Sequence, residues 1–207
     1  MGGYAQSIQR LIERLAELPG LGPKSAERIA FHLLKSSAEE ALALADAIRE
    51  VKTRIRPCST CFHLTEDDPC SICTDPRRDR GLVCVVEQPK DLLAIEAAGA
   101  YGGLYHVLLG RVAPTEGIGL EQLTVGALVQ RIARSRGHGE QPIREVILAT
   151  NPTVEGDVTA AHILDLIKPQ FPDLTVSRLA RGLSAGANIE NANRSILTDA
   201  LAGRRAV

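Results

Sequence analysis

Four cysteines within sixteen residues are the first feature of this sequence that points to chemistry. They form two Cys-x-x-Cys pairs, Cys58 with Cys61 and Cys70 with Cys73. Each pair places two thiolates on one turn, and two such turns can surround a Zn²⁺ ion tetrahedrally. His63 is a further candidate ligand, but four cysteines already complete the coordination. A site with four cysteine ligands has no open position, so we predict one structural zinc ion per chain that stabilises this short segment.

A hairpin rich in glycine and proline is the second feature. Residues 18–28 read Leu-Pro-Gly-Leu-Gly-Pro-Lys-Ser-Ala-Glu-Arg, and Lys24 and Arg28 lie four residues apart on one helix face. Glycines allow an anion to approach the backbone closely, and the free N–H groups that open a helix point toward it. The alternative is a tight turn between two helices with a solvated basic face. The whole pattern resembles a helix-hairpin-helix module, a type of module that contacts DNA phosphates without reading bases.

Three acidic residues follow the ends of two predicted strands. Glu87 ends the first of them, and Glu155 and Asp157 follow the third. Ligands of an open parallel sheet gather beyond the carboxyl ends of its strands, and three carboxylates there can hold Mg²⁺. The alternative is that Glu87 and Asp157 are surface or capping acids, with Asp157 as the N-cap of a helix that begins at Val158. On spacing alone we favour this alternative slightly.

The elements that position these residues follow from the period of the apolar residues. Apolar residues at helical spacing predict three helices at the start of the chain, which form a small all-helical unit. Beyond residue 81, short apolar runs alternate with helical patterns, which is typical of βαβ units. We therefore expect an α/β fold with a mostly parallel sheet and helices on both of its faces. The expected helices are residues 5–17, 24 onward, 38–54, 91–98, 125–134 and 158–167, and the expected strands are residues 82–86, 104–108, 146–149 and 174–177.

Three smaller expectations complete the chain. Residues 135–142 are polar, so we expect a mobile loop there. The tail carries one predicted helix around Ile196, Leu197 and Leu201, with little to bury it. Cys84 lies in the middle of a predicted strand, where a free cysteine behaves as a small buried apolar residue.

Composition limits the function classes that remain. The chain has 207 residues with 24 Lys and Arg against 25 Asp and Glu, a net charge of −1 that excludes a strongly basic nucleic-acid coating protein but not a local basic patch. Aromatic residues make up 3% and Trp is absent, which weighs against a single-strand binder built on aromatic platforms. No apolar run approaches the ~20 residues that span a bilayer, and the polar N-terminus lacks a signal sequence, so we expect a cytoplasmic protein that does not bind membranes.

The order of these parts resembles the RecR family of bacterial recombination mediators over almost the whole chain. The resemblance is carried by LPGLGPKSAERIAFHL, by CSTC and CSIC, and by VCVVEQPKDLLAIE, GLYHVLLG, GIGLEQL and ILATNPTVEGDVTA. It implies a helix-hairpin-helix DNA-binding unit at residues 1–55, a four-cysteine zinc finger at 56–79, a Toprim domain at 80–176 and a short helical C-terminal segment at 177–207.

The same resemblance implies a function. RecR-like proteins form a ring, usually a tetramer, that clamps DNA without catalysis and acts with RecO and RecF to load RecA at gaps and breaks. By carry-over, Lys24 and Arg28 contact DNA, the four cysteines bind zinc, and Glu155 lies in the Toprim motif associated with RecO. We expect double-stranded and gapped DNA to bind with little sequence preference.

This chain departs from the family near its end, and two other functions stay open. Residues 182–193 read GLSAGANIENAN where the family has a Gly-x-Pro-x-Gly-Gly-x-Leu-Glu-Tyr-x-Asp pattern, so the role of that motif is not carried over. One alternative is a Mg²⁺-dependent Toprim-type nuclease or topoisomerase that uses the three acids. A topoisomerase also needs a tyrosine nucleophile, and neither Tyr101 nor Tyr105 has an identifiable activating base. The other alternative is a protein-binding adaptor whose hairpin packs between subunits.

Overall fold

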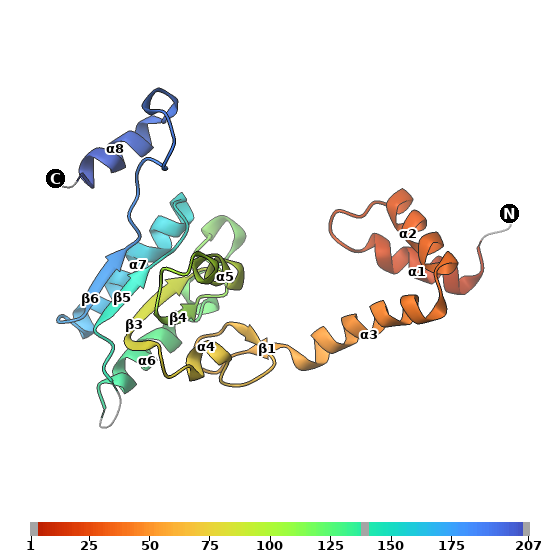
Figure 1. The fold of residues 1–207 in the computed structure, drawn as a ribbon, viewed down its shortest axis with the longest axis horizontal. Coiled ribbons are helices and arrows are strands. Elements are labelled where there is room, and N and C mark those ends of the chain that lie inside the picture. Colours follow the sequence, from red (N-terminus) through yellow and green to blue (C-terminus); the bar gives the residue numbers. More distant parts are fainter. Residues whose placement is uncertain (1–3, 138–140, 205–207) are drawn as a thin grey trace. The chain divides into compact units, whose positions relative to one another are not determined.

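The computed structural model describes residues 4–137 and 141–204, and the chain divides into two compact units, Met1–Ile55 and Arg56–Val207 (Figure 1). The first unit is all-helical, as predicted, and consists of α1 (Gln6–Ala16), α2 (Pro23–Lys35) and α3 (Ala38–Arg54). Ala26 and Ala30 are buried where α2 packs against α1, because side chains this small allow the two helices to approach closely.

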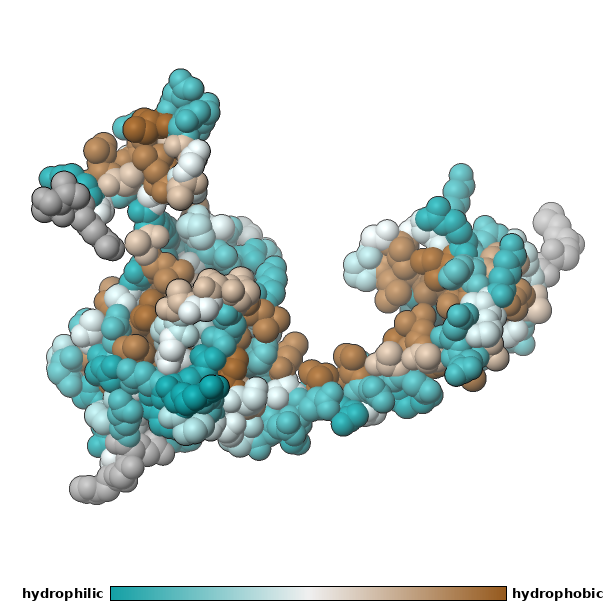
Figure 2. Space-filling model, viewed as in Figure 1, coloured by the Kyte–Doolittle hydropathy of each residue, from teal (hydrophilic) through white to brown (hydrophobic). Residues whose placement is uncertain are grey.

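Part of the apolar surface of the first unit stays open, and Figure 2 shows it as brown patches over these helices. Leu34 on α2 and Leu44, Ile48 and Val51 on α3 are exposed. α3 thus has apolar residues at helical spacing, yet none of its residues is buried. The packing of α1 against α2 is therefore the main interaction that holds this unit together.

The second unit begins with the cysteine-rich segment, which holds more regular structure than the sequence predicts. β1 (Arg56–Pro57) and β2 (Leu64–Thr65) form a two-stranded antiparallel ribbon, and α4 (Ser71–Thr74) makes a single turn. Strands of two residues are too short for apolar periodicity to indicate them.

A four-stranded parallel sheet forms the centre of the second unit. Its strands are β3 (Asp79–Val86), β4 (Gly103–Val107), β5 (Glu145–Leu148) and β6 (Thr175–Arg178), in the order β4-β3-β5-β6. The four predicted strands are therefore confirmed, although β3 extends further toward the N-terminus than its apolar run indicates.

Helices cover both faces of this sheet, and the alternation of side chains along β3 explains how. Val83 and Val85 face a core that α6 (Val125–Ser135) and α7 (Val154–Gln170) complete. Cys84 and Val86 face the opposite core, which α5 (Pro89–Ala98) and apolar side chains of the zinc segment cover. Cys84 is thus the buried apolar residue that the sequence predicts, and burial raises the pKa of its thiol to about 12.

The start of α7 corrects one prediction. The helix begins at Val154 and is capped by Thr153, whose hydroxyl accepts a hydrogen bond of 3.1 Å from the Gly156 N–H. Asp157 therefore lies in the first turn, and the prediction that it caps a helix starting at Val158 is wrong. The apolar period marks only the buried stripe of a helix, and the first turn of α7 lies before that stripe.

The remaining segments are the loop after α6 and the tail. Ser135 is buried at the end of α6, where its hydroxyl accepts a hydrogen bond from the Ile143 N–H, so the expected loop begins later than predicted. Residues 138–140 of that loop lie outside the described residues. The tail contains the predicted helix, α8 (Arg194–Ala202), none of whose residues is buried. Among the described residues, no helix is long and apolar enough to cross a membrane.

Candidate functional site

The four cysteines of the zinc segment converge in one buried cluster. Their sulfur atoms all lie within 4.8 Å of one another, with Sγ–Sγ distances of 3.9 Å from Cys58 to Cys73 and 3.6 Å from Cys61 to Cys70. Zn–S bonds of ~2.3 Å in a tetrahedron place sulfurs about 3.8 Å apart, which these distances match. The cluster consists of the four cysteines alone, and His63 is not a member of it.

The protonation of these thiols shows why the cluster needs a cation. The hydrogen bond from Cys73 lowers the pKa of Cys61 to about 5, whereas burial raises the pKa of Cys70 to about 11. The hydrogen bond to Cys61 and burial together raise the pKa of Cys73. The protein thus favours the thiolate of Cys61 and opposes those of Cys70 and Cys73, and a divalent ion that binds the cluster removes this opposition. The donor set therefore fits one structural zinc ion.

The zinc segment is fixed to the edge strand β4. The Val107 N–H donates a hydrogen bond of 2.7 Å to the Cys61 carbonyl, and the Phe62 ring meets the His106 ring edge to face with centroids 5.2 Å apart. These contacts make the conformation of the cysteine turns part of the packing of the sheet. Loss of the metal is therefore expected to loosen this face of the second unit as well as the segment itself.

Arg131 of α6 is a further link that sequence reasoning missed. Its Nη1 donates hydrogen bonds to the carbonyl of Tyr105 at 2.6 Å and to that of Thr60 at 3.4 Å, so it joins α6 to β4 and to a cysteine turn. Burial lowers the pKa of Arg131, while the thiolates of the cysteine cluster oppose this shift. The one sign of a buried arginine in the sequence is that Arg131 lies beside Leu128 and Ile132 in the apolar stripe of α6. This position does not identify the residues to which Arg131 bonds.

The hairpin of the first unit has the backbone geometry of an anion site. The Leu21 N–H donates to the Leu18 carbonyl at 3.0 Å, which closes a turn with Gly20 at φ +83, a left-handed conformation that favours glycine. α2 then opens at Pro23. Within the described residues, the N–H groups of Gly22 and Lys24 donate to no protein acceptor, so both are available to a ligand.

Lys24 and Arg28 provide positive charge beside these N–H groups. Both side chains are exposed on α2, and neither pairs with a carboxylate of the described residues. Apart from Gly22 and its two chain neighbours, no described residue has an atom within 4 Å of the position a Cβ would take at Gly22, which leaves space for a phosphate to approach the backbone. The free N–H groups and two exposed cations suit a phosphodiester backbone.

Glu87 does not lie at the surface, as the capping interpretation would place it, but is 3% exposed. Its carboxylate accepts hydrogen bonds from the backbone N–H of Asn151 at 2.7 Å and from the Asn151 side chain at 2.8 Å. A Cβ at Gly156 would lie 2.9 Å from Glu87 Oε1 and 2.1 Å from the Asn151 carbonyl oxygen, so this position requires glycine. Glu87 therefore fastens the loop after β5 to the end of β3.

The three acids do not converge on one metal site. Asp157 forms salt bridges with Arg178 and Arg181, and the hydrogen bond from Arg181 is the main cause that lowers the pKa of Asp157. Glu155 is half-buried, and its carboxylate has no hydrogen-bond or ion-pair partner among the described residues. Only the cysteine quartet gathers three or more metal-ligating groups within residues 4–137 and 141–204.

Three family models match this chain in the order of its parts. They are the RecR helix-hairpin-helix model over residues 8–52, the RecR four-cysteine zinc finger model over residues 55–75 and the Toprim domain model over residues 81–180. Proteins named Recombination protein RecR from Rhodopirellula baltica, Pelotomaculum thermopropionicum and Rubrobacter xylanophilus are each 51% identical to this chain over 205 residues. These alignments cover 99% of this chain and 98% or 99% of each relative.

The zinc assignment predicts that Cys58→Ser removes the metal, because three thiolates and a serine hydroxyl bind Zn²⁺ far more weakly than four thiolates. We expect about one zinc per chain in the wild-type protein and almost none in the variant, measured by elemental analysis. Cys84→Ser, which changes a cysteine outside the cluster, is the control and should keep its zinc. Full zinc content in Cys58→Ser would contradict the assignment.

The position of Glu87 predicts a loss of stability for Glu87→Gln. An amide at this position cannot accept both hydrogen bonds from Asn151, which leaves a buried polar group unpaired at a cost of about 1–3 kcal/mol. We expect the thermal midpoint to fall by several degrees, at roughly 2–4 °C per kcal/mol for a chain of this size. Glu155→Gln is the matched control and should leave the midpoint unchanged; equal midpoints for Glu87→Gln and the wild type would show that the contact with Asn151 contributes nothing.

Proposed function

This chain belongs to the RecR family of recombination proteins, with a role in recombinational repair, and from that premise we propose that it is a non-enzymatic DNA clamp. In this proposal, the protein binds double-stranded and gapped DNA with little sequence preference and acts with RecO and RecF to load RecA. The observation that carries DNA binding is the hairpin, where free N–H groups of the backbone lie beside the exposed Lys24 and Arg28. These groups suit phosphates, and contacts to phosphates position DNA without carrying information on its sequence.

The near-neutral charge of the chain supports a clamp that contains several copies. One protomer offers few cations to DNA, so we expect it to bind weakly and with a clear dependence on salt. A ring of four copies multiplies these contacts through avidity. A tetramer, a cytoplasmic location and the division of the chain at residues 55, 79 and 176 remain parts of this proposal.

The side chains that an enzyme would need are committed elsewhere, which favours the clamp over a nuclease or topoisomerase. The Tyr105 hydroxyl donates to Glu96 at 2.6 Å, and that of Tyr101 donates to the Leu104 carbonyl at 3.0 Å. Burial is the main cause that raises the pKa of both tyrosines, which opposes their use as nucleophiles. Glu87 is held by Asn151, so it is not free to take part in a Mg²⁺ site with the other acids.

We assign the docking of RecO to Glu155. Its carboxylate is the one acid of the three that no described residue engages, so its charge is available to a basic partner. Thr153 and Gly156 fix the first turn of α7 around it, which gives the side chain a defined position. This edge of the sheet belongs to the second unit and the hairpin to the first, so the two assignments depend on different residues.

The DNA-binding assignment predicts that Lys24→Ala/Arg28→Ala weakens binding to a gapped duplex. Loss of two phosphate contacts should reduce the slope of log affinity against log salt by about 1.8, at ~0.9 per contact, and reduce affinity on the order of tenfold. Fluorescence anisotropy across a salt series measures both quantities. Arg10→Ala/Lys52→Ala removes the same charge from exposed positions of the same unit and is the control.

Two outcomes would contradict this function. Unchanged DNA affinity in Lys24→Ala/Arg28→Ala would favour the protein-binding adaptor, whose hairpin packs only between subunits. The same gapped duplex, incubated with Mg²⁺ and run on a denaturing gel, should keep every strand intact. Cleavage or relinking that Glu87→Gln abolishes would replace the clamp with a Toprim-type enzyme.

The docking assignment predicts that Glu155→Ala weakens the binding of RecO. Loss of one charged contact at an interface should reduce affinity by about tenfold, measured by isothermal titration calorimetry. Asp165→Ala removes an exposed acid from the same helix and should bind RecO as the wild type does. Equal affinities for all three proteins would remove Glu155 from the interface.

A further inference from the structure

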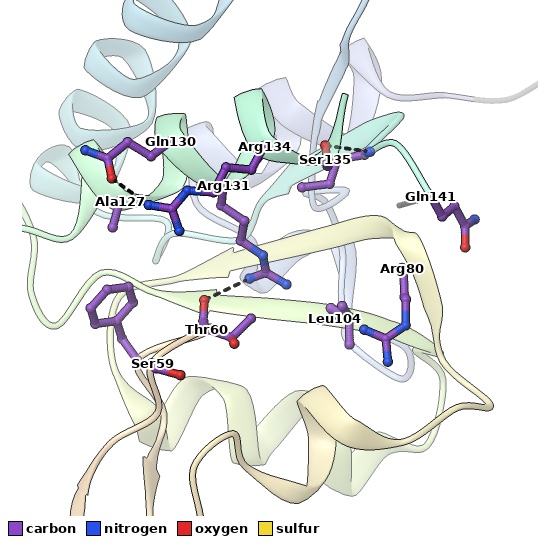
Figure 3. Close-up of a pocket in the computed structure, with 12 residues that line it drawn as sticks. Ser59, Thr60, Arg80, Leu104, Ala127, Gln130, Arg131, Arg134, Ser135 and Gln141 are labelled. Carbon is purple, nitrogen blue, oxygen red and sulfur yellow. Dashed lines mark hydrogen bonds between the residues drawn. The ribbon is translucent and has the colours of Figure 1, made fainter. Parts of the chain in front are cut away.

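A cavity of about 710 Å³ opens in the second unit between the zinc segment, the first residues of β3 and β4, and α6 (Figure 3). Its volume lies in the range of roughly 300–1,000 Å³ that is typical of small-molecule sites. Three arginines from two elements of the fold line it. Arg80 comes from β3, and Arg131 and Arg134 come from α6, with no acidic residue among the described lining residues.

None of these three arginines has a carboxylate partner in the described part of the chain. Arg134 bonds to the Gln130 amide oxygen at 3.3 Å, and Arg80 bonds to the Cys73 carbonyl at 3.4 Å. Other arginines of the second unit pair with acids, as Arg78 does with Glu96 and Arg136 with Asp173. The cavity therefore gathers three positive charges that no carboxylate of the described residues pairs with.

Negative charge nearby accounts for only part of this excess. Zinc bound to four thiolates carries a charge of about −2, and Arg131 lies beside it with its Nη1 on the Thr60 carbonyl. Asp79 accepts a hydrogen bond from Gln141 of the lining but is already paired with Arg144. Arg80 and Arg134, which are both exposed, keep charges that no described carboxylate balances.

The rest of the lining suits a ligand that is part polar and part flat. The hydroxyls of Ser59 and Thr60 and the amide of Gln130 offer neutral hydrogen bonds to an anion. Phe62 and Leu104 supply an apolar wall in the same cavity. Guanidinium groups bind phosphate oxygens with two parallel hydrogen bonds, and an apolar wall suits the base of a nucleotide.

The cavity is separate from the acidic edge of the sheet. Arg80 and Leu104 lie at the amino ends of β3 and β4, whereas Glu87 follows the carboxyl end of β3. The eight residues of β3 span about 26 Å at ~3.3 Å per residue. The arginine cavity and the proposed RecO site therefore lie at opposite edges and are open to separate tests.

We propose that this cavity binds a phosphate group, carried by a nucleic-acid strand or by a free nucleotide, with Arg80 and Arg134 as its principal ligands. Arg131 lines the same cavity and holds the zinc segment in place through its hydrogen bond to the Thr60 carbonyl. The nucleic-acid form rests on the DNA binding proposed above, whereas the nucleotide form stands without it.

The test uses the full-length protein, the double variant Arg80→Gln/Arg134→Gln and two probes. ADP is titrated by isothermal titration calorimetry, and a fluorescein-labelled thymidine 20-mer is followed by anisotropy. Both substituted side chains are exposed, so zinc content and circular dichroism should match the wild type. Arg194→Gln/Arg204→Gln removes the same charge from the tail and is the control. We expect the double variant to lose affinity for at least one probe by about tenfold, and the control to lose none.

The two probes distinguish the source of the phosphate. Loss of ADP binding assigns the site to a nucleotide, and loss of oligonucleotide binding alone assigns it to a nucleic-acid strand. The proposal is overturned by unchanged affinity for both probes, by a wild-type protein that binds neither, or by an equal loss in the control. Lys24→Ala/Arg28→Ala, measured in parallel, shows separately whether DNA binding by the hairpin has failed.

Discussion

Four ionised thiols repel one another in a buried cluster unless a cation binds them, and the structure of the second unit depends on this constraint. The cysteines are buried although their segment has no apolar core of its own, so metal coordination must hold its turns together. Once held, the turns present the Cys61 carbonyl to Val107 and the Phe62 ring to His106. The zinc segment thereby covers the free edge of β4, and its Phe62 and Ile72 side chains pack against the core on the α5 side of the sheet.

The direction of the strands then separates the charges of this unit. All four strands are parallel. The residues that follow β3 and β5 therefore meet at one edge, beyond the carboxyl ends of the strands, and the residues that begin β3 and β4 meet at the opposite edge, at the amino ends. Glu87 and Glu155 belong to the first edge, and Arg80 belongs to the second. Glu87 fastens that first edge together through Asn151, which leaves Glu155 as the available charge there.

Sequence patterns predicted the elements well, because apolar period and turn residues are local signals. The three helices of the first unit, the four strands and the cysteine quartet follow from such signals. What they do not contain is the partner of a buried polar group. Glu87 and Asn151 are 64 positions apart, and Arg131 reaches Thr60 across 71, so neither pairing has a pattern in the sequence. The first turn of α7 was missed because its one large apolar residue, Val154, is exposed and lies outside the apolar stripe that predicted the helix.

The net charge of −1 does not reveal how charged side chains are distributed over the protein. Seven arginines of the second unit form salt bridges with acids, as Arg144 does with Asp79, so the net charge says little about any one surface. The cations that remain unpaired in the described chain include Lys24 and Arg28 of the hairpin and the arginines of the cavity. The hairpin and the cavity can each bind one or two phosphates, which is too few for tight binding of DNA by one copy. A protein built in this way gains affinity for DNA through repetition of weak contacts among copies, which makes binding reversible and insensitive to sequence.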